Sequence, residues 1–155
     1  MTDATLSFAV VFLAFGGTVA WLALGARRAE PTSGQRLVAE LRLAQFAALL
    51  LALAAAVPIG FALGHDDAPG TGLVVAIAAA CFVVAALVTT WEPVRALTAL
   101  ALAWGAHALA NLAHVAGLLP PEIVPRWYPP ACATYDVLVA ALCYLPVLRR
   151  QESAP

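Results

Sequence analysis

The sequence predicts an all-α integral membrane protein, a bundle of five transmembrane helices. Hydrophobic residues make up 63% of its 155 residues, and charged residues make up only 11%. A soluble domain carries about 25% charged residues, so this chain has too few charges to cover a surface that faces water. Five apolar segments each approach the length of about 20 residues that a helix needs to cross the hydrocarbon core. A bilayer also favours helices, because they satisfy their own backbone polar groups.

The first two apolar segments are separated by a polar linker, residues 27–42. The basic residues Arg27 and Arg28 follow the first segment instead of preceding it. A cleaved secretory signal carries positive charge ahead of its apolar run, so we expect an uncleaved span here. The helical spacing of Arg36 and Glu40 predicts that the second helix begins within the linker.

The remaining three segments are joined by short connections. The third is rich in alanine and valine and ends at Trp91. Pro120-Pro121 ends the fourth, because proline removes a backbone donor and cannot continue a helix. The fifth segment is the shortest and contains Asp136. In one transmembrane domain over residues 1–155, the predicted spans cover about residues 6–26, 43–63, 73–91, 94–119 and 131–148.

The basic residues of the chain predict its orientation. All eight are arginines, and seven of them fall on one side of the five-span topology. Cytoplasmic connections retain positive charge, so we expect the N-terminus outside and the C-terminus inside. The absence of lysine and the abundance of alanine indicate a bacterial protein, which would be multi-pass in the inner (plasma) membrane. The seven arginines are Arg27, Arg28, Arg36, Arg42, Arg95, Arg149 and Arg150, against Arg126 on the other side.

The fourth predicted span carries the most informative polar residues, His107, Asn111 and His114. Their spacing of four and then three residues places them on one helix face, together with Trp104. Polar side chains within a membrane are costly unless they face protein, one another or water. We therefore expect this face to look into the bundle.

Asp136 on the fifth span is the expected partner of His114. Each lies five residues from the outer end of its predicted span, and consecutive antiparallel spans bring such positions to one depth. A carboxylate would orient the imidazole, and Tyr135 would extend the network. Ligand binding or a proton relay is one interpretation of these residues, and interhelical hydrogen bonding alone is the other. The candidates are His107, Asn111, His114, Tyr135, Asp136 and Trp104.

Helix geometry limits which cofactors this chain can hold. His107 and His114 lie about 10 Å apart along one helix, which is too far for them to share a metal ion. A haem with two histidine ligands would need His65 or a histidine of another subunit. Haem and quinone stay open as cofactor classes, as does a metal site at the outer face. Its ligands would be His65, Asp66, Asp67, His114 and Asp136.

Three functions stay open. The first is a non-catalytic subunit or small-molecule-binding bundle that uses the polar cluster of the fourth and fifth spans. The second is a transporter or proton-conducting component, and the third is a redox subunit that binds haem or quinone. The sequence contains no nucleotide-binding, hydrolase or CxxC motif, so an enzyme is not expected. The net charge of −1 gives no reason to expect nucleic acid. The expected partners are the bilayer and either further copies of the chain or a larger membrane complex.

Overall fold

A computed structural model of the chain describes residues 3–30, 32–64, 70–119 and 124–152. These residues form five helices and no strand. Each helix contains a segment that is long and apolar enough to cross a membrane, which confirms the predicted all-helical character. The helices are α1 (Asp3–Arg28), α2 (Gly34–Leu63), α3 (Thr71–Val88), α4 (Pro93–Val115) and α5 (Tyr128–Glu152).

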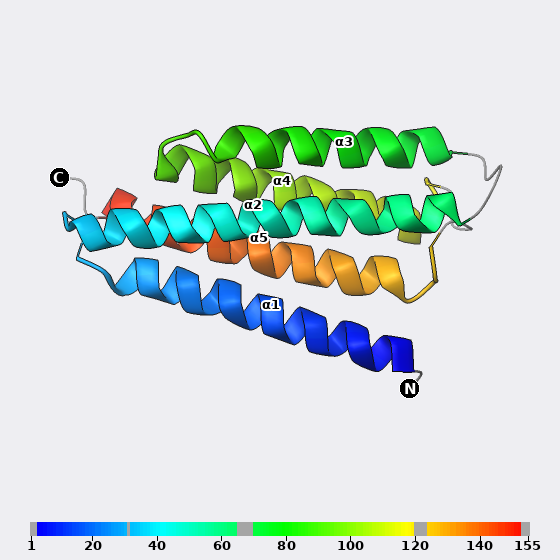
Figure 1. Ribbon diagram of the computed structural model, residues 1–155, viewed down its shortest axis with the longest axis horizontal. Helices are drawn as coiled ribbons and strands as arrows, with labels where there is room; N and C mark the ends of the chain where they lie inside the picture. Colours follow the sequence, from blue (N-terminus) through cyan, green and yellow to red (C-terminus); the bar gives the residue numbers. More distant parts are fainter. Residues whose placement is uncertain (1–2, 31, 65–69, 120–123, 153–155) are drawn as a thin grey trace.

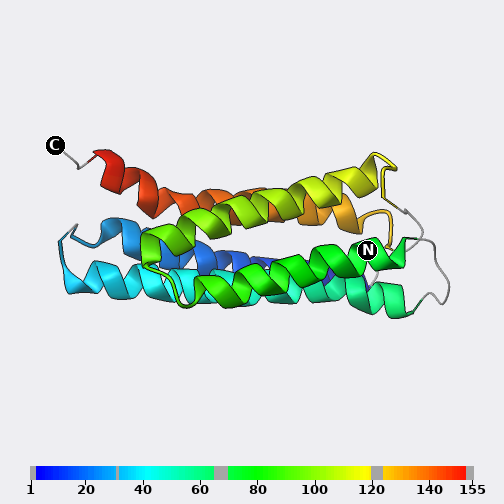
Figure 2. The same cartoon turned by 90° about the horizontal axis from the view of Figure 1, so that it is seen from above.

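The five helices run along the long axis of the molecule, and successive helices point in opposite directions (Figure 1). Helices α4 and α5 form the most extensive packing contact. They make one layer, and α1, α2 and α3 make the other (Figure 2). Helix α2 contacts all four other helices, whereas α1 packs only on α2 and α5. Helix α1 therefore lies at one edge of the bundle and α3 at the opposite edge.

Local capping explains where α2 and α4 begin. Ser33 precedes α2, and its hydroxyl accepts a hydrogen bond from the backbone N–H of Arg36 at 3.3 Å. Glu92 precedes α4, and its carboxylate accepts a hydrogen bond from the backbone N–H of Arg95. Pro93 occupies the first turn of α4, where its missing N–H is not needed. Helix α2 starts nine residues before the predicted span at Leu43, which confirms that the helix begins within the linker.

The ends of the α4–α5 hairpin differ from the predicted spans. Helix α4 ends at Val115 instead of residue 119, and Gly117 adopts a left-handed conformation with a φ of 71°. Glycine enters this conformation without a steric penalty, so it is a natural helix terminator. Helix α5 begins at Tyr128, three residues before the predicted start at Ala131. Both shifts change which residues of the two helices face each other.

The side chains of the bundle are apolar both inside and outside. Large apolar residues fill the interior, and alanines such as Ala47 and Ala55 allow the helices to approach closely. Large apolar side chains also cover the exterior, where Leu13 is 76% exposed and Leu102 is 72% exposed. A surface of this kind is unfavourable in water but matches the interior of a bilayer.

A buried ion pair lies within α2 near the start of that helix, and its arginine also bonds α5. Arg36 and Glu40 are fully buried, with Arg36 Nε 2.8 Å from Glu40 Oε1. Arg36 Nη2 also donates to the backbone oxygen of Pro146 at 2.9 Å. The sequence interpretation counted Arg36 among the charges of the first connection and did not predict its burial against Glu40 and α5.

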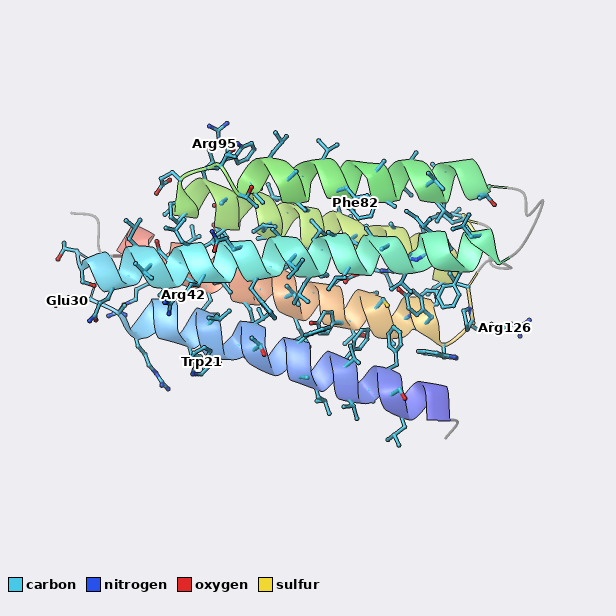
Figure 3. The ribbon with its side chains drawn as sticks, in the orientation of Figure 1. Trp21, Glu30, Arg42, Phe82, Arg95 and Arg126 are labelled. Carbon is cyan, nitrogen blue, oxygen red and sulfur yellow. The ribbon has the colours of Figure 1, made fainter. Side chains whose placement is uncertain are left out.

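The exposed arginines outside this ion pair are unevenly distributed between the two ends of the bundle. Arg42 and Arg95 lie towards one end of the bundle, and Arg126 lies at the other end (Figure 3). Arg95 also stacks over Trp91, with its guanidinium carbon 4.4 Å from the centre of the indole ring. Cation–π stacking of this kind suits the headgroup region, where one side of the indole is apolar and the other is wet.

Candidate functional site

The centre of the candidate site is a hydrogen-bonded cluster of His107, Asn111 and Asp136. His107 Nδ1 lies 2.9 Å from Asp136 Oδ2, and Asn111 Nδ2 donates to the same oxygen at 2.8 Å. All three side chains are buried, and Asp136 is only 1% exposed. Two residues of α4 therefore converge on one carboxylate of α5. The sequence predicted the participants but chose a different histidine as the partner.

The hydrogen bonds of Asp136 favour one tautomer of His107. Asp136 Oδ2 accepts from the Asn111 amide, so the His107 contact is best satisfied when Nδ1 carries a proton and donates to the same oxygen. His107 Nδ1 and Asn111 Nδ2 then lie 3.4 Å apart as two donors that share an acceptor. In this tautomer of the neutral ring, His107 Nε2 is the acceptor nitrogen.

The expected pairing of His114 with Asp136 was wrong. His114 Nδ1 bonds the backbone oxygen of Ala110 in its own helix at 3.0 Å. The reason is the position of the helix ends, because α4 stops at Val115, eight residues after His107. Asp136 likewise lies eight residues after Tyr128, the start of α5. His107 and Asp136 are thus equally far from the hairpin connection, whereas His114 is in the last turn of α4.

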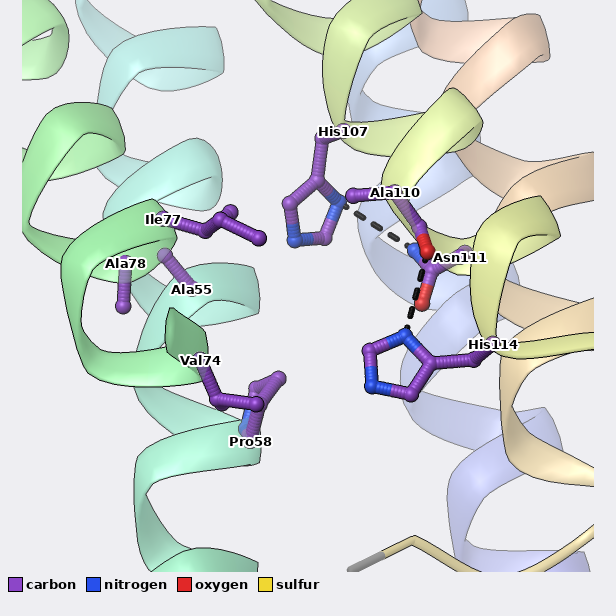
Figure 4. A pocket seen from close by; sticks show the side chains of 9 residues that line it. All are labelled: Ala55, Pro58, Val74, Ile77, Ala78, His107, Ala110, Asn111 and His114. Atoms are coloured by element: carbon purple, nitrogen blue, oxygen red, sulfur yellow. Dashed lines mark hydrogen bonds between the residues drawn. The ribbon is translucent and has the colours of Figure 1, made fainter. Parts of the chain in front are cut away.

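A small cavity of about 30 Å³ lies between α4 and the α2–α3 pair. The rings of His107 and His114 point into it from α4, facing apolar residues of the other two helices (Figure 4). His114 Nε2 is buried and has no protein partner. When Nδ1–H donates to the Ala110 oxygen, Nε2 of the neutral ring is an acceptor. The volume suits one water molecule that donates to such nitrogens.

A second cavity, of about 120 Å³, lies on the other side of the cluster. We call it the aromatic pocket. Helices α1, α2, α4 and α5 all contribute to its walls, and Asp136 lines it. Its remaining walls are apolar and largely aromatic: Phe8, Val11, Phe12, Phe15, Leu50, Leu53, Ala54, Val57, Trp104, Tyr128, Cys132 and Tyr135.

Two hydrogen-bond donors on the wall of the aromatic pocket have no protein partner. They are Trp104 Nε1 and the Tyr135 hydroxyl. The sequence interpretation expected Tyr135 to extend the polar network, but its hydroxyl makes no hydrogen bond to the cluster. Its ring stacks on Phe12 at 4.5 Å between centroids and meets Trp104 edge-on at 6.1 Å. Buried donors without partners are rare in native structures, so each calls for an explanation.

The aromatic residues of the pocket on α1 were missed by the sequence interpretation. Phe8, Phe12 and Phe15 are spaced four and three residues apart, which places them on one face of α1. Tyr128, Cys132 and Tyr135 repeat that spacing on α5 and line the same cavity. The two matching patterns were present in the sequence, but nothing in it indicated that α1 and α5 are neighbours.

The described residues can be compared with the metal site, the haem and the quinone that the sequence left open. His65, Asp66 and Asp67, three of the expected metal ligands, lie outside the described residues. Within the described ranges, no three His, Cys, Asp or Glu side chains group to hold a metal ion. His107 and His114 line a cavity the size of one water, so a haem does not fit between them. The aromatic pocket is larger and lined by rings, which fits the head of a quinone better.

The site therefore consists of a buried His–Asp–Asn cluster with a water-sized cavity on one side and the aromatic pocket on the other. Its polar atoms come from α4 and α5, and its aromatic walls come from α1, α4 and α5. A ligand in the aromatic pocket would contact four of the five helices. No protein-family model matches the chain, and no curated protein or solved structure is significantly similar to it.

Proposed function

We propose that this chain is a multi-pass protein of a bacterial plasma membrane, with its N-terminus outside and its C-terminus inside. Two observations support insertion: five helices of sufficient length and hydropathy, and large apolar side chains on the outer faces. The orientation rests on the arginines, because Arg42 and Arg95 lie opposite to Arg126. Assembly into a homo-oligomer or into a larger membrane complex belongs to the same proposal.

Within the membrane, the proposed function is to bind a small ring-shaped molecule in the aromatic pocket. The observation that carries this proposal is the pair of buried, unpartnered donors, Trp104 Nε1 and the Tyr135 hydroxyl, on the wall of one cavity. A buried donor without a partner is unfavourable by about 1–3 kcal/mol, and a ligand oxygen would remove that penalty. A ring flanked by Phe12 and Phe15 would also gain offset or edge-to-face contacts.

The chemistry of the walls defines the class of ligand. The pocket offers donors and aromatic surface but contains no basic side chain, so a neutral molecule with carbonyl or ether oxygens suits it better than an anion. Its volume is close to that of an engineered cavity of about 150 Å³ that holds benzene. A benzoquinone head has the required size, flatness and two acceptor oxygens. We therefore propose a quinone-like ring as the ligand class.

The His107–Asp136 pair has a defined role in this proposal. Asp136 lines the aromatic pocket, while its Oδ2 atom is held by His107 and Asn111. Two donors compensate the buried carboxylate and fix its direction. The carboxylate thus forms a rigid acidic edge that disfavours anionic ligands. In this proposal the pair holds one wall of the binding site in place and takes no part in a chemical reaction.

Ligand binding can be tested with the purified protein in detergent, a tail-free benzoquinone, and toluene as a ring without acceptors. We expect saturable quenching of tryptophan fluorescence by the quinone, and we expect toluene to compete poorly. Tyr135→Phe removes one donor while keeping the ring, and should weaken binding by about tenfold. Tyr144→Phe is the matched control, because Tyr144 is on the same helix and does not line the pocket. Equal losses in both variants would refute the proposal.

Proton conduction is the second candidate, and one observation favours it. His107 lines the water-sized cavity, and its partner Asp136 lines the aromatic pocket on the other side of the cluster. A histidine with an acceptor nitrogen on one side and a carboxylate on the other has the chemistry of a proton relay. Proteoliposomes with a pH-sensitive dye test this: a proton leak abolished by Asp136→Asn supports it, and no leak above that of empty liposomes argues against it.

A further inference from the structure

A groove runs along the outer face of the bundle between α1 and α5, and it shares Phe12 and Tyr135 with the wall of the aromatic pocket. We call it the α1–α5 groove. Its middle is apolar and is formed by residues that include Leu13, Gly17 and Ala20 of α1 and Leu138 and Leu142 of α5. The groove has a volume of about 610 Å³ and faces outward. Its walls come from α1 and α5 alone, whereas four helices contribute to the walls of the aromatic pocket.

A basic pocket adjoins the α1–α5 groove at the end of the bundle where α1 stops. It is lined by Leu24, Arg27 and Arg28 of α1 and by Arg149 of α5. Along α1, Gly17, Ala20 and Leu24 succeed one another at helical spacing and lead to Arg28, so the groove and the basic pocket share one face. The same holds for Leu138, Leu142 and Arg149 on α5. The apolar groove and the basic pocket therefore follow each other along the same faces of α1 and α5.

The length of this surface corresponds to one leaflet of a bilayer. Gly17 and Arg28 are eleven residues apart, and so are Leu138 and Arg149 on the facing helix. At 1.5 Å per residue each interval is about 17 Å, close to half of a hydrocarbon core about 30 Å thick. With the arginines at headgroup depth, the glycine region would lie near the bilayer midplane.

We propose that the α1–α5 groove binds an anionic phospholipid, with its phosphate at Arg27, Arg28 and Arg149 and one acyl chain along the apolar floor. The proposal relies on the membrane insertion proposed above but not on the aromatic pocket. Arginine donates paired hydrogen bonds to phosphate oxygens and is weakly hydrated, so it suits this role. Basic pockets between helix ends on the cytoplasmic side are known headgroup sites.

Charge favours a lipid over a second copy of this chain as the occupant. Among the described residues that line the groove and its mouth, three are basic and none is acidic. Two copies that met through this face in the same orientation would bring their arginines together, which is repulsive. An anionic lipid would instead neutralise the arginines while it covers the apolar floor.

Gly17 allows the groove to be filled without disturbing the fold. A Cβ atom built at Gly17 meets nothing within 4 Å, whereas one at Gly16 would lie 3.3 Å from the Tyr135 ring. Gly17→Leu therefore places a large side chain on the floor of the groove at little cost to packing. Gly60→Leu makes the same change on the exposed face of α2, where nothing lies within 4 Å either, and serves as its control.

The test is native mass spectrometry of the full chain in a mild detergent, titrated with phosphatidylglycerol or with phosphatidylcholine of identical acyl chains. We expect tighter retention of phosphatidylglycerol, weakened roughly 30-fold by Arg27→Gln with Arg149→Gln, at about 1 kcal/mol for each arginine. The double variant Arg42→Gln with Arg95→Gln removes equal charge outside the groove and should retain the lipid. Gly17→Leu should lower retention, and Gly60→Leu should not.

Three results would overturn the proposal. They are equal retention of the two lipids, equal losses in the two arginine pairs, and a dimer free of lipid that Gly17→Leu disrupts. The last result would assign the groove to a second copy. Trp104→Phe provides the link to the ring-binding proposal, since it removes the indole donor, and Trp104 lines the aromatic pocket but not the groove. Lipid retention that survives Trp104→Phe separates the two sites, so either proposal can fail alone.

Discussion

His107 Nδ1 lies 2.9 Å from Asp136 Oδ2, and this contact sets the register of the α4–α5 hairpin. The carboxylate also receives the Asn111 amide, so one acidic group of α5 is shared by two residues of α4. Both helices are apolar along most of their length, and apolar contacts alone are tolerant of sliding. A polar contact with fixed geometry is not, because a shift would leave buried charge without a partner.

Replacing each histidine of α4 with leucine should therefore have unequal effects. His107→Leu leaves the buried Asp136 carboxylate without its imidazole partner and should destabilise the protein by about 3–5 kcal/mol. His114→Leu removes only a bond to the backbone of its own helix and should be destabilising by about 1 kcal/mol or less. Thermal unfolding in detergent, followed by circular dichroism, measures both. Equal losses would show that the His107–Asp136 pair does not set the stability of the hairpin.

The buried Arg36–Glu40 pair should show strong coupling. Arg36→Met or Glu40→Leu alone removes one member of the buried ion pair, so each should destabilise the protein by about 3–5 kcal/mol. The double variant removes both charges and should be more stable than either single variant. Unfolding of all four proteins forms a double-mutant cycle. Additive losses would mean that Arg36 acts through its Pro146 contact and not through Glu40.

Two glycines near and within α4 should respond to alanine in opposite ways. Gly117 has a φ of 71°, where an alanine side chain is strained, so Gly117→Ala should destabilise by about 1–2 kcal/mol. Gly105 lies within α4, and an added Cβ there meets nothing within 4 Å. Gly105→Ala should leave stability unchanged or raise it by up to about 1 kcal/mol. Comparison of the unfolding midpoints gives the signs, and a neutral Gly117→Ala would argue against its role in ending α4.

The proposed orientation predicts the accessibility of single cysteines at the two ends of the bundle. Arg126→Cys should react with a membrane-impermeant maleimide on intact bacterial cells, and Glu30→Cys should react only after permeabilisation. The native thiols, Cys81, Cys132 and Cys143, are buried and should give little background. The reverse labelling pattern would place the arginine-rich end outside. Labelling of both positions in intact cells would argue against membrane insertion altogether.

Much of the architecture follows from the sequence because it depends on local properties. Helix number follows from five apolar stretches, since a segment without charge has a strong preference for a nonpolar solvent. The early start of α2 follows from the spacing of Arg36 and Glu40. The spacing of Trp104, His107 and Asn111 placed all three on one face, and that face is buried in the bundle. Periodicity along a single helix was sufficient for each of these predictions.

Only the tertiary structure decided which residues meet across helices. The sequence paired His114 with Asp136 because it extended α4 to residue 119, and the left-handed turn at Gly117 shortens the helix. The burial of Arg36 against Glu40 and the closure of the aromatic pocket by Phe8 and Phe12 depend on neighbours distant in sequence. Composition and periodicity determine that a helix has a buried face. The positions of helix ends and the packing order of the helices determine which side chains share that buried space.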